Sequence, residues 1–161
     1  MSVNLIGVDK LEKCVSDFVK PFGLTAKLDT DFAYYYEKDL ITFSIFDIIA
    51  NDLFLIDAES RFPNLIGVPS FIWCTMHEVG HQETWDDLTD EELEESTEIK
   101  KNIDTDSTSS KMTYFTCPDE YAATEWAGNY IESHREEIDE FWKSFLKALV
   151  EFYTVNHITE D

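Results

Sequence analysis

The sequence predicts an α+β fold in which a small, mostly antiparallel sheet packs against a central helix and a long C-terminal helix. Short runs of alternating apolar and polar residues between 24 and 45 are typical of strands. An apolar run at 71–76 indicates a buried helix, and apolar residues recur at helical spacing from 121 to 152. With 161 residues, 43% of them hydrophobic, the chain can bury one core, so we expect a single domain over residues 1–161.

The N-terminal half begins with one helix and continues with short strands. Apolar residues at helical spacing predict an amphipathic helix over 8–20. Strands are predicted at 24–28, 32–37 and 40–45, and Lys38-Asp39 is expected to connect the last two as a hairpin.

The stretch that follows is less regular until a second helix begins. Residues 45–58 fit either a strand around 54–56 or a helix, because both periods match the apolar positions. Residues 61–68 contain proline and glycine and predict a loop. Pro69-Ser70 then opens a helix, since proline suits the first helical turn.

Acidic residues dominate the next segment, and we expect an acidic, exposed insertion around residues 86–110. A short helix is predicted near 89–96, followed by a mobile polar loop at 105–110. A solvated linker is the favoured interpretation, with a lid or a partner-docking surface as alternatives.

The last element is predicted to be a long helix that covers the core. Thr116 and Asp119 have the spacing of a capping box, and Pro118 falls in the first turn. The pattern fits one helix, or two helices with a break near Ser133-His134.

The formal net charge of −22 limits the class of partner. Such a surface repels nucleic-acid phosphates and anionic membranes, so we expect no direct nucleic-acid or membrane binding and a preference for basic partners. The N-terminus lacks the features of a secretory signal, and no apolar run is long enough for a bilayer. Three cysteines without a framework spacing fit free thiols in a cytoplasmic protein.

A candidate metal site lies at His77-Glu78-Val79-Gly80-His81. Residues four apart on a helix project from the same face, so His77 and His81 can bind one zinc ion together. Glu78 is placed to act as the general base that activates a water molecule. Gly80 costs helix stability, which indicates close packing of a neighbouring backbone.

A catalytic zinc needs a third protein ligand and one open position. Glu120 and Glu125 are the acidic candidates in a later helix whose small residues permit close approach of two helices. Tyr114 and Tyr121, near the start of that helix, are candidates to stabilise an oxyanion, although a structural role is the favoured interpretation. A strand such as 40–45 could bind extended substrate by β-augmentation.

The chain resembles the ImmA/IrrE type of minimal gluzincin, a zincin-like metallopeptidase family. The resemblance rests on the His-Glu-x-Gly-His helix and on a second motif that matches Glu120, Ala123 and Trp126-Ala127. It implies one zinc ion held by His77, His81 and Glu120. Thr124 stands where the family usually has Asp or Asn to steady a ligating histidine.

Two functions follow as hypotheses. The first is a zinc-dependent metallopeptidase that hydrolyses an intracellular protein, and the resemblance implies a DNA-binding repressor as substrate, in bacteria or mobile elements. The alternative is a non-enzymatic acidic inhibitor that mimics DNA charge on a zincin scaffold, from a phage or mobile element. Its motivation is the net charge of −22.

Overall fold

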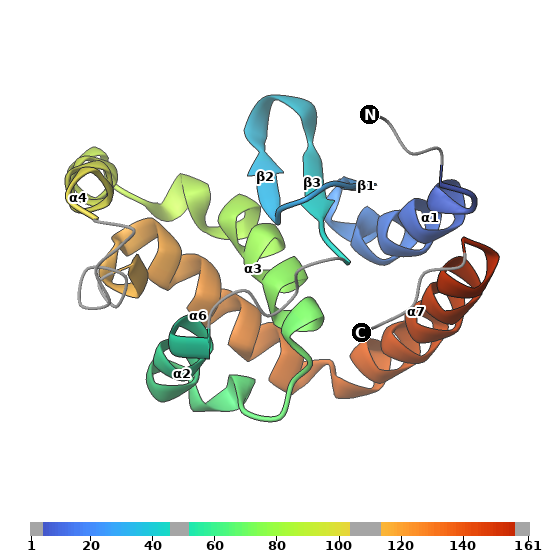
Figure 1. Cartoon of the computed structure of the whole chain (residues 1–161). Helices are drawn as coiled ribbons and strands as arrows, with labels where there is room; N and C mark the ends of the chain where they lie inside the picture. The colour runs from blue at the N-terminus through green and yellow to red at the C-terminus, as the bar shows by residue number, and fades with distance from the viewer. Residues whose placement is uncertain (1–4, 46–51, 104–113, 157–161) are drawn as a thin grey trace.

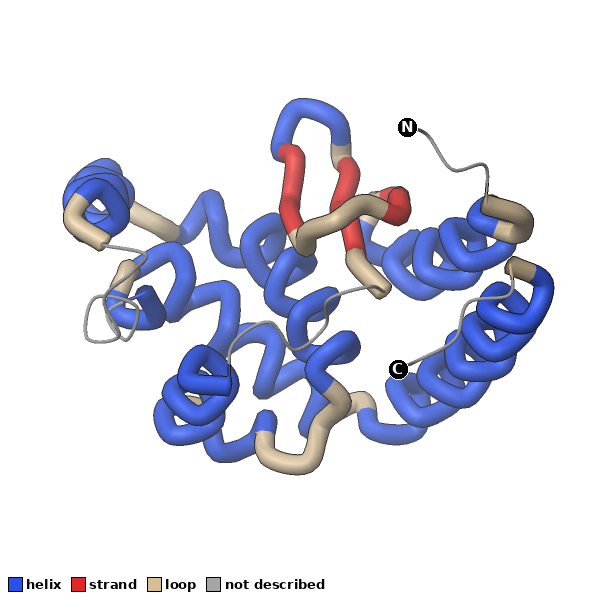
Figure 2. Tube along the Cα trace, viewed as in Figure 1, coloured by secondary structure: helices blue, strands red, loops and turns tan. Residues whose placement is uncertain are grey.

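The computed structural model describes residues 5–45, 52–103 and 114–156, and in that part of the chain it is an α+β fold, mostly helical, with one small sheet (Figures 1 and 2). In chain order the elements are α1 (Val8–Val19), β1 (Thr25–Leu28), β2 (Ala33–Tyr35), β3 (Leu40–Phe43), α2 (Asp52–Arg61), α3 (Ser70–Thr84), α4 (Asp90–Lys101), α6 (Pro118–Ser133) and α7 (Arg135–Val155). The predicted fold class is confirmed at this coarse level.

The sheet has the strand order β1-β3-β2 and is mixed, so the prediction of a mostly antiparallel sheet is wrong. β1 pairs with β3 in parallel, and β2 pairs with β3 antiparallel as the expected hairpin. The hairpin connection is a 3-10 turn at Tyr36–Lys38, followed by Asp39 in the left-handed region at φ 47°. Alternation in a sequence shows which residues face the core, but it does not show which strand lies next to which.

The two outer edges of the sheet differ. On β1, both the N–H and the C=O of Ala26 bond the Ser16 hydroxyl, and the N–H of Leu28 donates to the Glu12 carboxylate at 2.9 Å. Helix α1 therefore closes that edge with its own side chains. Strand β2 contacts α3. Its outer edge is paired with no strand in the described part of the chain.

Helix α3 runs through the middle of the molecule and packs along α6 (Figure 1). Nine of the ten positions of α3 from Phe71 to Gly80 are buried, all but Cys74, as expected for a helix that is apolar on most of its circumference. Its phenylalanine Phe71 stacks on Phe145 of α7 with ring centroids 4.2 Å apart. The helix that carries the histidine motif is therefore held on several sides.

Of the two alternatives left open for the C-terminal segment, the structure has two helices with a break, because α6 ends at Ser133 and α7 begins at Arg135. Helix α7 is amphipathic and packs against α1, with Phe18 and Phe141 stacked at 3.9 Å. Asn156 ties the two ends together, since its side chain bonds both the N–H and the C=O of Ile6.

Three further expectations are settled locally. Within 45–58 the described residues form helix α2 instead of a strand at 54–56, while 46–51 lie outside the described residues. The acidic helix is longer than predicted and has a capping box between Thr89 and Glu92. The capping box at Thr116 is wrong, because Cys117 is the N-cap of α6. The polar loop at 105–110 lies outside the described residues.

Candidate metal centre

Helices α3 and α6 approach each other at Gly80. A methyl group added at Gly80 would lie 2.3 Å from the backbone oxygen of Ala123, which is far inside contact distance. Ala123 and Ala127 on the facing side of α6 are also small and fully buried. The packing reason expected for Gly80 is therefore present, and side chains from both helices reach a common point.

That point is occupied by His77, His81 and Glu120. Oε2 of Glu120 lies 2.8 Å from Nε2 of His77 and 3.1 Å from Nε2 of His81. His77 and Glu120 are buried, with 6% and 4% of their surface exposed. Of the two candidates for a third ligand, the structure brings Glu120 to the histidines. Glu125 is exposed and lines a different groove, beside Arg61.

These three residues fit a metal ion. Two imidazole nitrogens and one carboxylate oxygen lie within 4.8 Å of one another and could hold a divalent ion. Bonds of about 2.0–2.1 Å in a tetrahedron separate ligand atoms by roughly 3.3 Å, so the two distances from Glu120 to the histidines would need to lengthen by only a few tenths of an ångström. The same donor set occurs in catalytic zinc sites, but the donors alone do not select zinc among transition metals.

Thr124 determines the orientation of His77. Its hydroxyl donates to the backbone oxygen of Glu120 at 2.8 Å, in the same helix. The Thr124 oxygen must then accept from Nδ1 of His77, which lies 2.8 Å away. Nδ1 therefore carries the proton, which directs the lone pair of Nε2 toward the metal position.

Glu78 lies beside this cluster and is 8% exposed. Burial raises the pKa of Glu78 above its ordinary value, against the opposing influence of His77 and His81. A raised pKa makes a carboxylate a stronger base.

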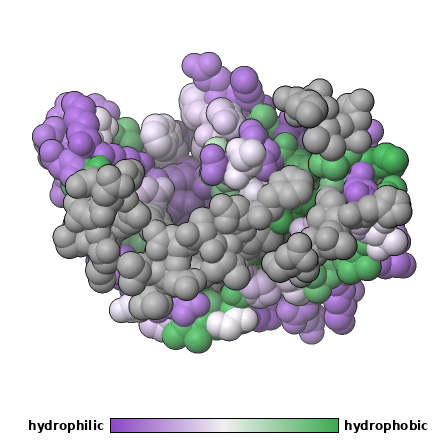
Figure 3. Space-filling model, viewed as in Figure 1, coloured by the Kyte–Doolittle hydropathy of each residue, from purple (hydrophilic) through white to green (hydrophobic). Residues whose placement is uncertain are grey.

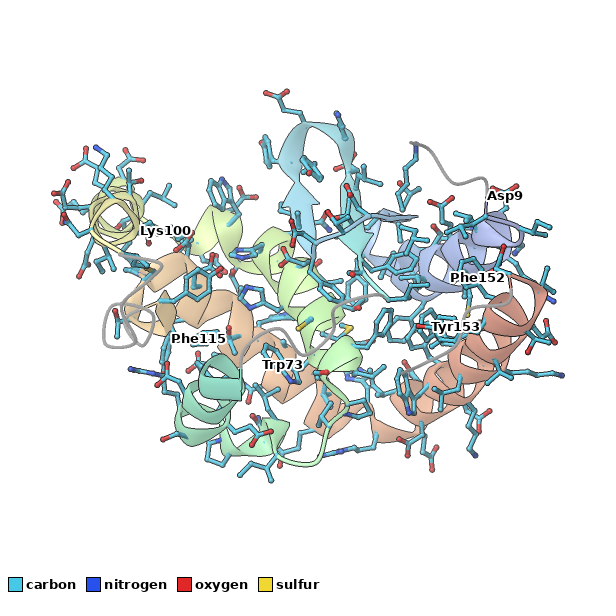
Figure 4. The ribbon with its side chains drawn as sticks, in the orientation of Figure 1. Asp9, Trp73, Lys100, Phe115, Phe152 and Tyr153 are labelled. Carbon is cyan, nitrogen blue, oxygen red and sulfur yellow. The ribbon has the colours of Figure 1, made fainter. Side chains whose placement is uncertain are left out.

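The cleft in front of the cluster has a volume of about 330 Å³ and is lined by Glu78, His81, Tyr114 and residues of β2. A smaller, mainly apolar pocket of about 130 Å³ is also lined by Glu78. Trp73 and Phe115 line it, and both are labelled in Figure 4. Glu78 therefore borders two cavities, a larger one lined by both charged and apolar side chains and a smaller one that is mainly apolar.

Burial and ion pairing compete in this cluster. Burial opposes ionisation of Glu120, but hydrogen bonds from His77 and His81 hold the pKa of that carboxyl well below its ordinary value. Burial also disfavours charge on His77, yet the contact with Glu120 raises the pKa of the imidazole.

Of the two tyrosines that are candidates to stabilise an oxyanion, only one lies at the cleft. Tyr114 lines both cavities beside Glu78, and burial raises the pKa of its hydroxyl. Tyr121 is 42% exposed and packs against Phe62, away from the cleft. Tyr114 is therefore the tyrosine that could act at the site.

The sequence did not reveal two residues of α4 that hold the start of α6, where Glu120 lies. Lys100 of α4 binds the carboxylates of Asp119 and Glu120, and Ser96 of α4 accepts the N–H of Asp119. Lys100 has an ordinary reason to stand at the end of a helix, because cations are favoured there. The sequence therefore held no signal that separated it from Lys101.

Comparison with known proteins finds no match: no family model, no curated protein and no solved structure matches this chain. None of the helices in the described part of the chain combines the length and apolar character that crossing a bilayer requires.

Proposed function

We propose that this protein is a zinc-dependent metallopeptidase of the ImmA/IrrE type, with His77, His81 and Glu120 as ligands of one zinc ion. The observation that carries the proposal is that Glu78 borders the same cleft as His81 and Glu120, and the same smaller pocket as the third candidate ligand, His77. A purely structural metal site has no use for a buried carboxylate beside its ligands. A catalytic site needs one as a general base.

Each residue has a defined task in this proposal. Bound zinc would supply a Lewis acid and lower the pKa of water to about 7. The Glu78 carboxylate accepts a proton from the attacking water and passes it to the nitrogen of the leaving amine. The hydroxyl of Tyr114, which hydrogen-bonds Glu120, would instead donate to the carbonyl oxygen as negative charge develops there.

The substrate would bind as an extended segment along β2. β3 cannot take this role, because both of its edges are paired. The prediction that the strand at 40–45 accepts substrate is therefore wrong, and the outer edge of β2 is the available one. Ala33 and Tyr34 of β2 line the cleft together with Glu78, so a paired peptide would pass in front of the base.

The acidic surface favours a basic protein as substrate. Hydrophilic residues gather over α4, at the left of Figure 3. Exposed carboxylates of Glu91, Glu94, Glu95 and Glu98 belong to this helix, whose Lys100 lines the cleft. The resemblance extends the proposal to a DNA-binding repressor, which is a class of basic protein.

The test uses the full chain purified without chelator. We expect one zinc ion per chain by elemental analysis and cleavage of a degenerate peptide mixture, read by mass spectrometry. Glu78→Gln should keep the metal and lose activity by about 10²–10⁴-fold, because the proton acceptor is removed. His81→Ala should lose both, and Glu83→Gln, an exposed change on the same helix, should alter neither.

A chain that binds no zinc, or a Glu78→Gln variant that cleaves as the wild type does, would contradict the proposal. The acidic inhibitor is the alternative, and it rests on the net charge of −22. It predicts salt-sensitive capture of a nucleic-acid-binding protein that Glu78→Gln leaves unchanged.

A further inference from the structure

The acidic helix α4 is attached to the candidate metal centre by one of its faces. Ser96 and Lys100 are four residues apart and therefore project from the same side of the helix. Ser96 is buried and accepts the N–H of Asp119 at 3.2 Å. Figure 4 labels Lys100 on the part of α4 that lies toward α6. This segment is therefore more than a solvated linker.

Lys100 binds two consecutive carboxylates at the start of α6. Its ammonium lies 2.7 Å from Oδ2 of Asp119 and 3.0 Å from Oε1 of Glu120. The ring of Tyr114 lies 5.9 Å from the same ammonium. The ammonium thus sits at the border of the cleft, on the side of Glu120 that faces away from the histidines.

The two oxygens of Glu120 have separate partners. Oε2 contacts Nε2 of both His77 and His81, whereas Oε1 contacts Lys100. The hydroxyl of Tyr114 also hydrogen-bonds this carboxylate, but Lys100 is its cationic partner. A carboxylate binds a metal through one oxygen or through both. An oxygen that is committed to an ammonium has less electron density to offer a second cation on its other side.

We propose that Lys100 is a positioning residue for the metal site, which restricts Glu120 to one donor oxygen by binding the other. The inference rests on the proposed function, because it assumes that the three candidate ligands hold a metal. Binding through one oxygen leaves the coordination position that catalysis needs open, whereas binding through both would fill it. Helix α4 contributes to the site through this lysine.

A simpler role for Lys100 is to neutralise Asp119 and hold α4 in place. The two roles differ in what happens to the metal. A residue that only anchors α4 can be removed without a change in how Glu120 binds. A positioning residue cannot be removed without freeing Oε1 for coordination.

Cobalt replaces zinc in the experiment, because its visible absorption reports coordination number. Four-coordinate cobalt absorbs more strongly than five-coordinate cobalt. The Co²⁺-loaded full chain is compared with Lys100→Met, Lys100→Arg and the control Lys101→Met, whose lysine is the exposed neighbour on α4. Circular dichroism shows whether each variant keeps its helices.

We expect Lys100→Met to lose about half or more of the visible absorption per bound cobalt, since geometry determines the spectrum. Lys100→Arg should keep it, because arginine restores a cation that can bind Oε1. Lys101→Met should match the wild type. If Lys100→Met does not fold, Asp119→Asn replaces it, and it should shift the spectrum in the same direction by removing the anchor of the ammonium.

The two proposals fail in different ways. If the wild type takes up neither cobalt nor zinc, the metal site fails, and the proposed function fails with it. If the wild type takes up cobalt and a folded Lys100→Met variant gives an unchanged spectrum, the metal site stands and the role of Lys100 is overturned.

Discussion

The hydroxyl of Thr124 lies between two groups that could each take its single proton. Because the proton goes to the backbone oxygen of Glu120, the oxygen of Thr124 is left as an acceptor for His77. A carboxylate at this position would accept more strongly, as a charged partner does. Threonine instead supplies a neutral acceptor and ties the orientation of His77 to the backbone of the helix that carries Glu120.

Replacing Thr124 with valine should weaken metal binding. Valine has nearly the same shape but no acceptor, so Nδ1 of His77 would be left without a partner in a buried site. We expect the zinc dissociation constant to rise by about 10–100-fold, the usual effect of losing such a partner. Competition with a chromophoric chelator measures it. Thr124→Ser keeps the hydroxyl and serves as the control, and equal affinities in both variants would contradict this account.

For single residues, the sequence was enough to identify the two histidines of the motif, but not the residues that surround the candidate site. His77 and His81 could be named because four-residue spacing on a helix implies one face. Glu120 was separated from Glu125 by resemblance alone, and the structure now does so by distance. Lys100 could not be named, because its partner lies 20 residues away and no local pattern records that contact.

Two glycines show how the helices are fitted together. Gly80 of α3 faces the backbone of Ala123, whereas Gly128 of α6 faces the side-chain end of Asn64. A backbone in a packed helix cannot move aside, but the end of a side chain can rotate. The two glycines therefore look alike in the sequence, but only Gly128 is expected to tolerate substitution by alanine.

Gly80→Ala should destabilise the protein, because the new methyl group would separate α3 from α6. Overpacking of this kind typically costs about 1–3 kcal/mol, which exceeds the gain of about 1 kcal/mol from replacing a helical glycine. Gly128→Ala is the matched change, and it should be neutral or stabilising by up to about 1 kcal/mol. Urea denaturation gives both free energies of unfolding. A loss at Gly128 as large as at Gly80 would refute the distinction.

At the level of elements, the helices were easier to predict than the sheet. The apolar spacing of α7 and the proline at the start of α6 mark those helices within a few residues. The position of β1 beside β3 depends on a chain crossing that no short pattern contains. The predicted capping box at the start of α6 was also wrong. The N–H of Asp119, which the Thr116 hydroxyl was expected to cap, donates instead to Ser96 of α4.

For the whole molecule, the net charge of −22 is the dominant property outside the core. Like charges repel one another across the surface, and this repulsion is relieved when the chain unfolds and expands. The stability of the fold therefore depends on screening by salt. The core of aromatic and aliphatic residues that spans the sheet, α1, α3, α6 and α7 has to exceed this repulsion.

Adding sodium chloride should raise the melting temperature of the metal-free protein. Between 0.01 and 0.1 M the screening length falls from about 30 to about 10 Å, which weakens repulsion between distant carboxylates. We expect an increase of several degrees, with one kcal/mol corresponding to about 2–4 °C for a chain of this size. Differential scanning calorimetry with potassium chloride as a second salt checks that ionic strength is responsible. A constant or falling melting temperature would show that the repulsion is unimportant.

The contrast between the two sheet edges has a consequence for association of the protein with itself. The edge of β1 is closed by Ser16 and Glu12, so it offers few groups to a second copy. The outer edge of β2 offers the same backbone groups to a substrate strand and to the β2 edge of another molecule. Its length of three residues makes such pairing weak, and the negative charge keeps copies apart. High salt, which favours the folded chain, therefore also removes the main barrier to dimerisation through this edge.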